Sequence, residues 1–204
     1  MLHTIQADFY RLFRSKGFWI TEAILVLNIL SGVIFGATGH FGVNTESKLP
    51  QATEVWTGFK ALTNYSASIS VTILFTIIVI TLVLGTDLTQ NLYKNSLAYG
   101  VSRTSYYFAK SAVVLTIALF QFLVSYGLVF LLATLYNGIG TMPEHFIAHF
   151  GLTVLIQFLS TLAWGSIISF LLYASQSITL AFVGYFIGNI LLSLPALFFK
   201  DIDI

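Results

Sequence analysis

Cysteine and charged residues are scarce in this sequence, and each shortage excludes a class of protein. None of the 204 residues is cysteine, which excludes a disulfide framework, an iron–sulfur cluster and a thiol nucleophile. Only 8% of the residues are charged, whereas a soluble domain carries about a quarter. Nine Lys and Arg against eight Asp and Glu leave a net charge of +1, too balanced for a nucleic-acid-binding protein. With 57% hydrophobic residues, the composition indicates an integral membrane protein.

Long apolar segments are the main feature of what remains. Crossing a bilayer as a helix takes roughly 20 mostly apolar residues, and five segments meet this length. They are residues 18–37, 67–86, 111–136, 147–173 and 177–198. No segment alternates polar and apolar residues as a transmembrane β-strand does. We therefore predict an all-α fold, a polytopic bundle of transmembrane helices that forms a single domain over residues 1–204.

Residues 1–17 precede the first span and are amphipathic. Their large apolar residues recur at helical spacing, at Ile5, Phe9, Leu12 and Phe13. We assign Asp8, Arg11 and Arg14 to the opposite face, which predicts a helix lying in the headgroup plane. Ordinary basic flanking sequence of a membrane span is the alternative, and the two are compatible.

The distribution of Lys and Arg predicts the orientation in the membrane, because cytoplasmic segments are enriched in both. Six basic residues fall on one side of the five spans: Arg11, Arg14, Lys16, Lys94, Arg103 and Lys110. Three fall on the other: Lys48, Lys60 and Lys200. We therefore expect a multi-pass protein of the cell membrane with its N-terminus in the cytoplasm. In the first external loop, Trp56 and Phe59 are expected at the outer membrane interface.

The segment between the second and third spans, residues 87–110, is the most informative. Asp87 stands where the second span ends, a helix-length run follows, and Gly100 interrupts it before the chain re-enters the membrane at Lys110. This order predicts a short helix along the membrane surface followed by a glycine turn. A plain connecting loop with basic residues is the alternative.

These residues resemble the permease subunits of ABC type-2 exporters. The resemblance is carried by Asp87, the helical segment, the Gly-x-Ser-Arg turn at 100–103 and Lys110, while the basic amphipathic N-terminus and the span spacing extend it to nearly the whole chain. Within that family, the sequence resembles the small bacterial permeases of antimicrobial-peptide immunity or peptide export. That family usually has six spans, so the resemblance implies either a sixth span after Ile204, which we favour, or a different topology.

The resemblance implies that residues 87–110 are a coupling loop that docks into a separate cytoplasmic ABC ATPase. The residues it assigns to coupling are Asp87, Leu88, Asn91, Leu92, Asn95, Gly100, Ser102 and Arg103. It also implies a second permease subunit, identical or a sister chain, and export of a peptide or another amphipathic or hydrophobic substrate. ATP and Mg²⁺ would be bound by the ATPase, and no cofactor by this chain. A non-transporting membrane scaffold or sensor without an ATPase partner is the alternative.

Other residues are assigned to helix packing or left without a chemical role. Small residues that let helices approach closely are expected at Gly32, Gly36, Gly165, Gly184 and Gly188. Glu22, the one charged residue within a predicted span, pairs with Lys16 or a headgroup, or makes a contact in the assembled transporter.

Catalytic and metal sites are not expected. His145 and His149 lack a third metal ligand, so no metal site is predicted. The chain has no phosphate-binding loop and no paired intramembrane acids, so we expect neither ATP hydrolysis nor any other catalysis from it.

Overall fold

The computed structural model describes residues 2–36, 55–89, 92–98, 100 and 102–198. All regular structure in these residues is helical. The helices in chain order are α1 (Leu2–Arg14), α2 (Lys16–Phe35), α3 (Gly58–Ala67), α4 (Ile69–Thr89), α5 (Leu92–Ala98), α6 (Arg103–Asn137), α7 (Phe146–Ser175) and α8 (Ile178–Phe198). The predicted fold class, a polytopic helical bundle, is confirmed.

Four of these helices, α2, α4, α6 and α7, are long and apolar enough to cross a membrane. The fifth predicted span, 177–198, corresponds to α8, which runs for 21 residues from Ile178 to Phe198 and is about as long as α2 and α4. Its side chains are described as far as Leu192, and this stretch is apolar.

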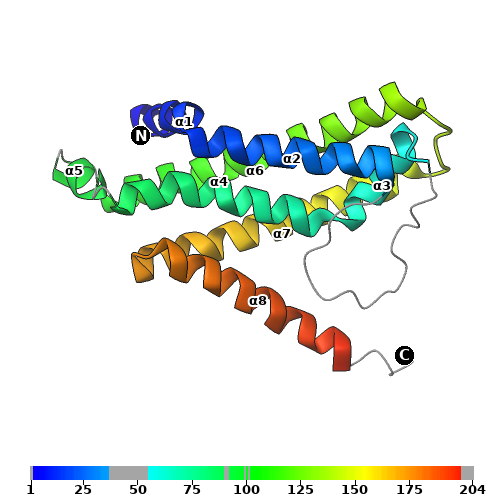
Figure 1. Cartoon of the computed structure of the whole chain (residues 1–204). Helices are drawn as coiled ribbons and strands as arrows, with labels where there is room; N and C mark the ends of the chain where they lie inside the picture. Colours follow the sequence, from blue (N-terminus) through cyan, green and yellow to red (C-terminus); the bar gives the residue numbers. More distant parts are fainter. Residues whose placement is uncertain (1, 37–54, 90–91, 99, 101, 199–204) are drawn as a thin grey trace.

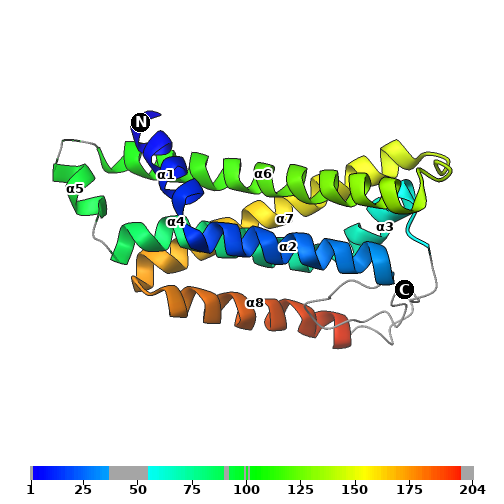
Figure 2. The same ribbon diagram turned by 45° about the horizontal axis from the view of Figure 1, so that its top comes forward.

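Serine side chains begin two of the helices. The Ser15 hydroxyl accepts a hydrogen bond from the backbone N–H of Phe18 at 3.1 Å and so separates α1 from α2 by a single residue. Ser102 caps α6 in the same way, accepting from the N–H of Ser105 at 3.2 Å. Such caps satisfy backbone donors that a helix start leaves free. The N-terminal helix is consequently fixed at an angle to the span that follows it, as Figure 2 shows.

The connections sort into two ends of the bundle. In Figure 1, α1, α5 and the turn between α7 and α8 lie at one end, and α3 lies at the other. The first of these ends carries Arg11, Arg14, Lys94, Arg103 and Lys110, and we call it the basic end. Lys60 of α3 lies at the opposite end.

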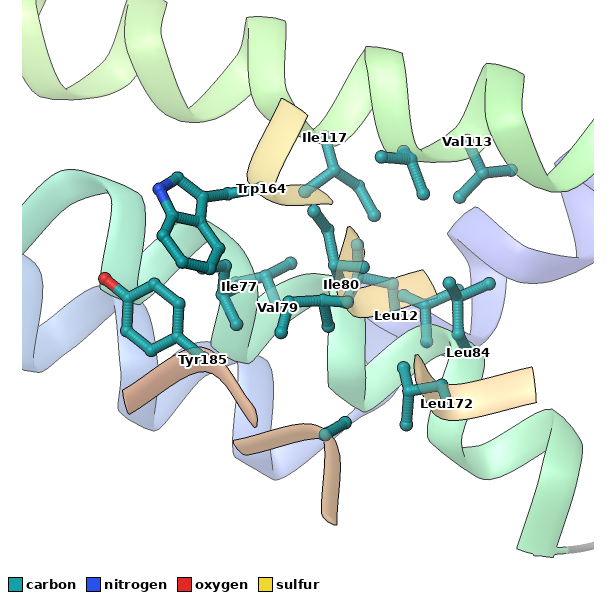
Figure 3. Packing of buried hydrophobic residues seen from close by; sticks show 14 of the residues in the cluster. Leu12, Ile77, Val79, Ile80, Leu84, Val113, Ile117, Trp164, Leu172 and Tyr185 are labelled. Carbon is teal, nitrogen blue, oxygen red and sulfur yellow. The ribbon is translucent and has the colours of Figure 1, made fainter. Parts of the chain in front are cut away.

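The larger hydrophobic core joins six helices, and α4 runs through it. Leu12 of α1 and Phe18 of α2 both contribute to this core, so the N-terminal helix packs onto the bundle. In Figure 3 side chains of α4, α6, α7 and α8 meet around Ile77 and Ile80, which are fully buried. The rings of Trp164 and Tyr185 pack edge to face with their centroids 5.0 Å apart, and this contact joins α8 to α7.

A second hydrophobic core lies near α3 and includes Trp56. Trp56, expected at the membrane interface, is 1% exposed and packs with Tyr65 of α3 and Val129 of α6. Its backbone carbonyl accepts a hydrogen bond from the Asn137 side chain at 3.1 Å. This burial concerns contacts within the protein, whereas the expected interface position concerns depth in the bilayer. The interface position of Trp56 and Phe59 therefore stays a prediction.

Candidate functional site

Four charged residues from three helices meet inside the basic end. Asp8 and Arg11 come from α1, Asp87 from the last turn of α4, and Lys110 from the beginning of α6. Asp8 and Asp87 are each 1% exposed and Lys110 is 3% exposed. Two carboxylates and two cations balance in charge, as buried ionic groups must. We call this cluster the four-charge network.

In the network each cation contacts both carboxylates. Lys110 Nζ donates to Asp8 Oδ2 at 2.6 Å and also pairs with Asp87. Arg11 Nη1 donates to Asp87 Oδ1 at 2.8 Å and also pairs with Asp8. The Tyr106 hydroxyl donates to Asp87 Oδ2 at 3.2 Å. These contacts form a closed ring that joins α1, α4 and α6.

Arg11 is the member of the network nearest to solvent, with 38% of its side chain exposed. Burial alone would lower the pKa of Arg11, but the charge and hydrogen bond of Asp87, together with those of Asp8, outweigh it and raise that pKa. Arg11 is therefore a permanent cation that closes the outer side of the network.

The position of Asp8 corrects the assignment made from the sequence. Asp8 was placed on the polar face of the N-terminal helix, yet its side chain points into the bundle. At 3.6 residues per turn, position 8 lies only about 40° around the helix from position 12, and Leu12 is part of the core. An aspartate is tolerated on that face because Lys110 and Arg11 meet it there.

A family model described as ABC-2 family transporter protein matches residues 4–197 of the chain. The chain belongs to this family. No curated protein and no solved structure matched the chain. The ABC-2 permease family is the membrane component of ABC transporters and is not itself catalytic.

The residues predicted to contact an ATPase lie in the segment between α4 and α6, and the structure describes most of them. Asp87 is buried in the four-charge network, and Leu88 packs against the larger core. Leu92 begins α5, Gly100 has φ +84°, Ser102 caps α6, and Arg103 is exposed. Asn91 and the side chain of Asn95 lie outside the described residues. Whether these residues touch an ATPase stays a prediction.

The glycines assigned to packing occupy different surroundings in this ABC-2 permease. A Cβ added at Gly165 of α7 would meet Val114 at 3.1 Å, and one at Gly188 of α8 would meet Trp164 at 2.8 Å. One at Gly184 would meet a methyl group of Leu171 at 2.5 Å. In α2, Gly32 is buried, while Gly36 ends the helix in a left-handed conformation at φ 66°.

Glu22 lies in α2 opposite Gln121 of α6. Its Oε1 atom is buried without a hydrogen-bond partner, and both polar atoms of the Gln121 side chain are buried without a bond of normal geometry. No ion pair joins Glu22 to Lys16 in the described part of the chain. The same part contains no group of three His, Cys, Asp or Glu residues that could hold a metal ion.

Sequence reasoning singled out Asp87 and Lys110 but missed that they meet Asp8 and Arg11. The contacts between α1 and α6 join residues as far as 102 positions apart, and no local pattern encodes such a pairing. One usable signal was present. A lysine at the mouth of an apolar span needs a carboxylate nearby if it is buried, and few carboxylates are available in this chain.

Proposed function

We propose that this ABC-2 permease is the membrane-spanning subunit of an ATP-driven exporter, and that a separate cytoplasmic ABC ATPase docks at the basic end, on α5 and the start of α6. The single observation that carries the proposal is the four-charge network. It fastens both sides of the α4–α6 connection to each other and to α1.

The surface that the ATPase would contact lies outside the network. Lys94 and Ala98 of α5 are exposed, and so are Ser102 and Arg103 at the start of α6. Asp87, by contrast, is buried, so in this proposal it holds the loop in place and does not touch the ATPase directly. In this proposal the ATPase would displace the exposed helix α5, and the buried side chain of Asp87 would transmit that displacement.

Transmission into the membrane follows from the connections of α1. The network ties α1 to the end of α4 and the start of α6, and a single residue, Ser15, joins α1 to α2. Leu12 and Phe18, on either side of that residue, are both packed into the larger core. A displacement of α5 would therefore move α2, α4 and α6 together, a rigid-body motion of packed helices.

The remaining parts of the proposal concern orientation, partners and substrate. Basic residues gather at the end that holds α1 and α5, which supports a cytoplasmic N-terminus. A second permease subunit, identical or a sister chain, would complete the transport path. A peptide or other amphipathic or hydrophobic substrate is supported by the likeness to small peptide-exporting permeases.

The test is ATP hydrolysis by the reconstituted complex. The tagged chain is purified from its native membrane, a co-purifying ABC ATPase is identified by mass spectrometry, and hydrolysis is measured with and without the permease. Ala98→Pro removes a backbone N–H of α5 and adds a ring clash, which disrupts its last turn. Ala98→Ser is the matched control, because serine keeps the N–H and nearly the same size.

We expect Ala98→Pro to abolish the stimulation of hydrolysis while its abundance in the membrane equals that of Ala98→Ser. Equal stimulation by the two variants would contradict docking on α5. If no ABC ATPase co-purifies and both variants behave as the original chain, the non-transporting scaffold is favoured instead.

A further inference from the structure

Two adjacent cavities at the basic end have lining residues in common, and we call them together the amphipathic groove. The larger, about 690 Å³, lies between α6 and α7 and includes Ser166, Leu162 and Phe170 in its lining. The smaller, about 280 Å³, is lined by Arg103, Tyr93 and Gln176 among others. Tyr107 and Tyr173 line both. The volume of the larger cavity is in the range of sites that hold small molecules, and that of the smaller is just below this range.

Polarity changes along this groove in one direction. Arg103, Tyr93 and Gln176 lie at the level of α5 and of the α7–α8 turn, outside the apolar stretches of the spans. Deeper in, the lining is mainly apolar, with Val114, Leu115 and Leu162 beside the small side chains of Ser166 and Ser169. The polar end thus stands at the membrane surface, and the apolar part faces the hydrocarbon.

The length of the apolar part fits one leaflet. From Tyr173 to Leu162 the groove follows α7 for 11 residues. At a rise of 1.5 Å per residue this is about 17 Å. Half of a hydrocarbon core of about 30 Å is about 15 Å. The groove therefore reaches from the membrane surface to the middle of the bilayer, as a single acyl chain does.

The positive charge at the polar end of the groove favours an anionic lipid headgroup. Arg103 is exposed and forms no ion pair with a described residue, so its guanidinium is available to a ligand. Lys110 also lines the groove, but its ammonium group is already held by Asp8 and Asp87. Basic pockets between transmembrane helices on the cytoplasmic side bind anionic lipid headgroups.

We infer that this groove binds an anionic phospholipid of the cytoplasmic leaflet, with its phosphate at Arg103 and an acyl chain between α6 and α7. The choice of leaflet rests on the proposed function, which places the basic end in the cytoplasm. A bound lipid would lie beside the four-charge network through Lys110, so its headgroup would border the part of the protein that the ATPase is proposed to push.

The experiment is native mass spectrometry of the full chain in detergent, titrated with phosphatidylglycerol or with phosphatidylcholine. Arg103→Gln removes the headgroup cation. Lys94→Gln is its matched control, since Lys94 is exposed at the same end but does not line the groove. Ser166→Trp fills the apolar part, and Ser160→Trp places the same bulk on α7 outside it.

We expect the original chain to retain phosphatidylglycerol in preference to phosphatidylcholine. Arg103→Gln should weaken phosphatidylglycerol binding about fivefold, which corresponds to about 1 kcal/mol for one basic residue at an anionic surface. Lys94→Gln should leave binding unchanged. Ser166→Trp should reduce the binding of both lipids, while Ser160→Trp should not. Equal retention of both lipids by the original chain, or no effect of Arg103→Gln, overturns the inference.

Two further outcomes separate this inference from its rivals. If Ser166→Trp lowers the dimer fraction in the same spectra and leaves the lipid count unchanged, a second copy of the chain occupies the groove and the lipid inference fails. Because the titration contains no ATPase, absent lipid binding together with normal ATPase stimulation would refute this inference alone. Lipid binding without any ATPase partner would refute the proposed function alone.

Discussion

Lys110 of α6 donates a hydrogen bond to Asp8 of α1 at 2.6 Å, and both side chains are almost completely buried. The two residues are 102 positions apart, so this bond joins the amphipathic N-terminal helix to the third apolar segment. Lys110 also pairs with Asp87 at the end of α4. One ammonium group thus sets the relative positions of three helices at the end where α5 lies.

The first prediction concerns the charge balance of this network. Lys110→Gln leaves two buried carboxylates with Arg11 alone, and we expect a loss of about 3–5 kcal/mol in stability. Asp8→Asn leaves two cations with Asp87 alone and is also expected to destabilise. The double variant retains one carboxylate and one cation, so its loss should be smaller than the sum of the two single losses. Thermal unfolding of the purified chain in detergent measures all three.

Lys94→Gln serves as the control for that cycle. Lys94 is exposed on α5 and makes no ion pair with a described residue, so its replacement should change stability by no more than about 0.5 kcal/mol. Strict additivity of Asp8→Asn and Lys110→Gln would show that the two groups do not interact, contrary to the geometry.

Much of the fold could be predicted because the bilayer imposes one simple length requirement. The segments predicted at 67–86, 111–136 and 147–173 overlap α4, α6 and α7, since a long apolar run has no other stable conformation in hydrocarbon. The short helix α3 could not be foreseen in this way. It is stabilised by contacts of Trp56 and Tyr65 with α6, which arise only after the chain has folded.

The candidate site was only half predictable for a related reason. Asp87 and Lys110 stand out because charged residues beside apolar spans are rare in this sequence. The sequence pattern assigns Asp8 to a polar face, because amphipathic patterning distinguishes polar from apolar side chains and does not show which polar side chain has a buried partner. That distinction depends on the packing of α1 against α6, which is a tertiary property.

The second prediction compares glycines that contact other helices with one that does not. Gly188→Ala should destabilise the protein by about 1–3 kcal/mol, because the added Cβ would meet the ring of Trp164, which is buried against Tyr185. Gly184→Ala should cost less, since the atom it meets is the end of a flexible leucine side chain. Gly151→Ala of α7 meets nothing within 4 Å and should be neutral or stabilising, because alanine favours the helix. Thermal unfolding of the three variants gives the order, and a Gly188→Ala variant as stable as Gly151→Ala would contradict the packing of α8 on α7.

The third prediction separates the two interpretations of Glu22. The carboxylate lies within α2 with one buried oxygen that has no hydrogen-bond partner, which is costly in a membrane span. Glu22→Gln keeps the shape and removes the charge, so we expect a gain in stability of about 1 kcal/mol. If Glu22 also makes a contact in the assembled transporter, ATPase stimulation by the more stable variant should fall. Gln121→Leu is the comparison variant on the facing helix. A loss of stability in Glu22→Gln would contradict the prediction, because it would show that the carboxylate has a stabilising partner.

The last prediction uses the absence of cysteine to test which end of the bundle faces the cytoplasm. Because the chain has no cysteine of its own, a single one introduced at an exposed position gives an unambiguous signal. Ala98→Cys places it on α5 at the basic end, and Lys60→Cys places it on α3 at the opposite end; both positions are exposed. The five basic residues that define the basic end favour the cytoplasm, so in intact cells a membrane-impermeant maleimide should label Lys60→Cys and leave Ala98→Cys unlabelled. After the cells are opened, both variants should react, which controls for burial of the thiol. Labelling of Ala98→Cys in intact cells would place α5 and the four-charge network outside, where no cytoplasmic ATPase could reach them.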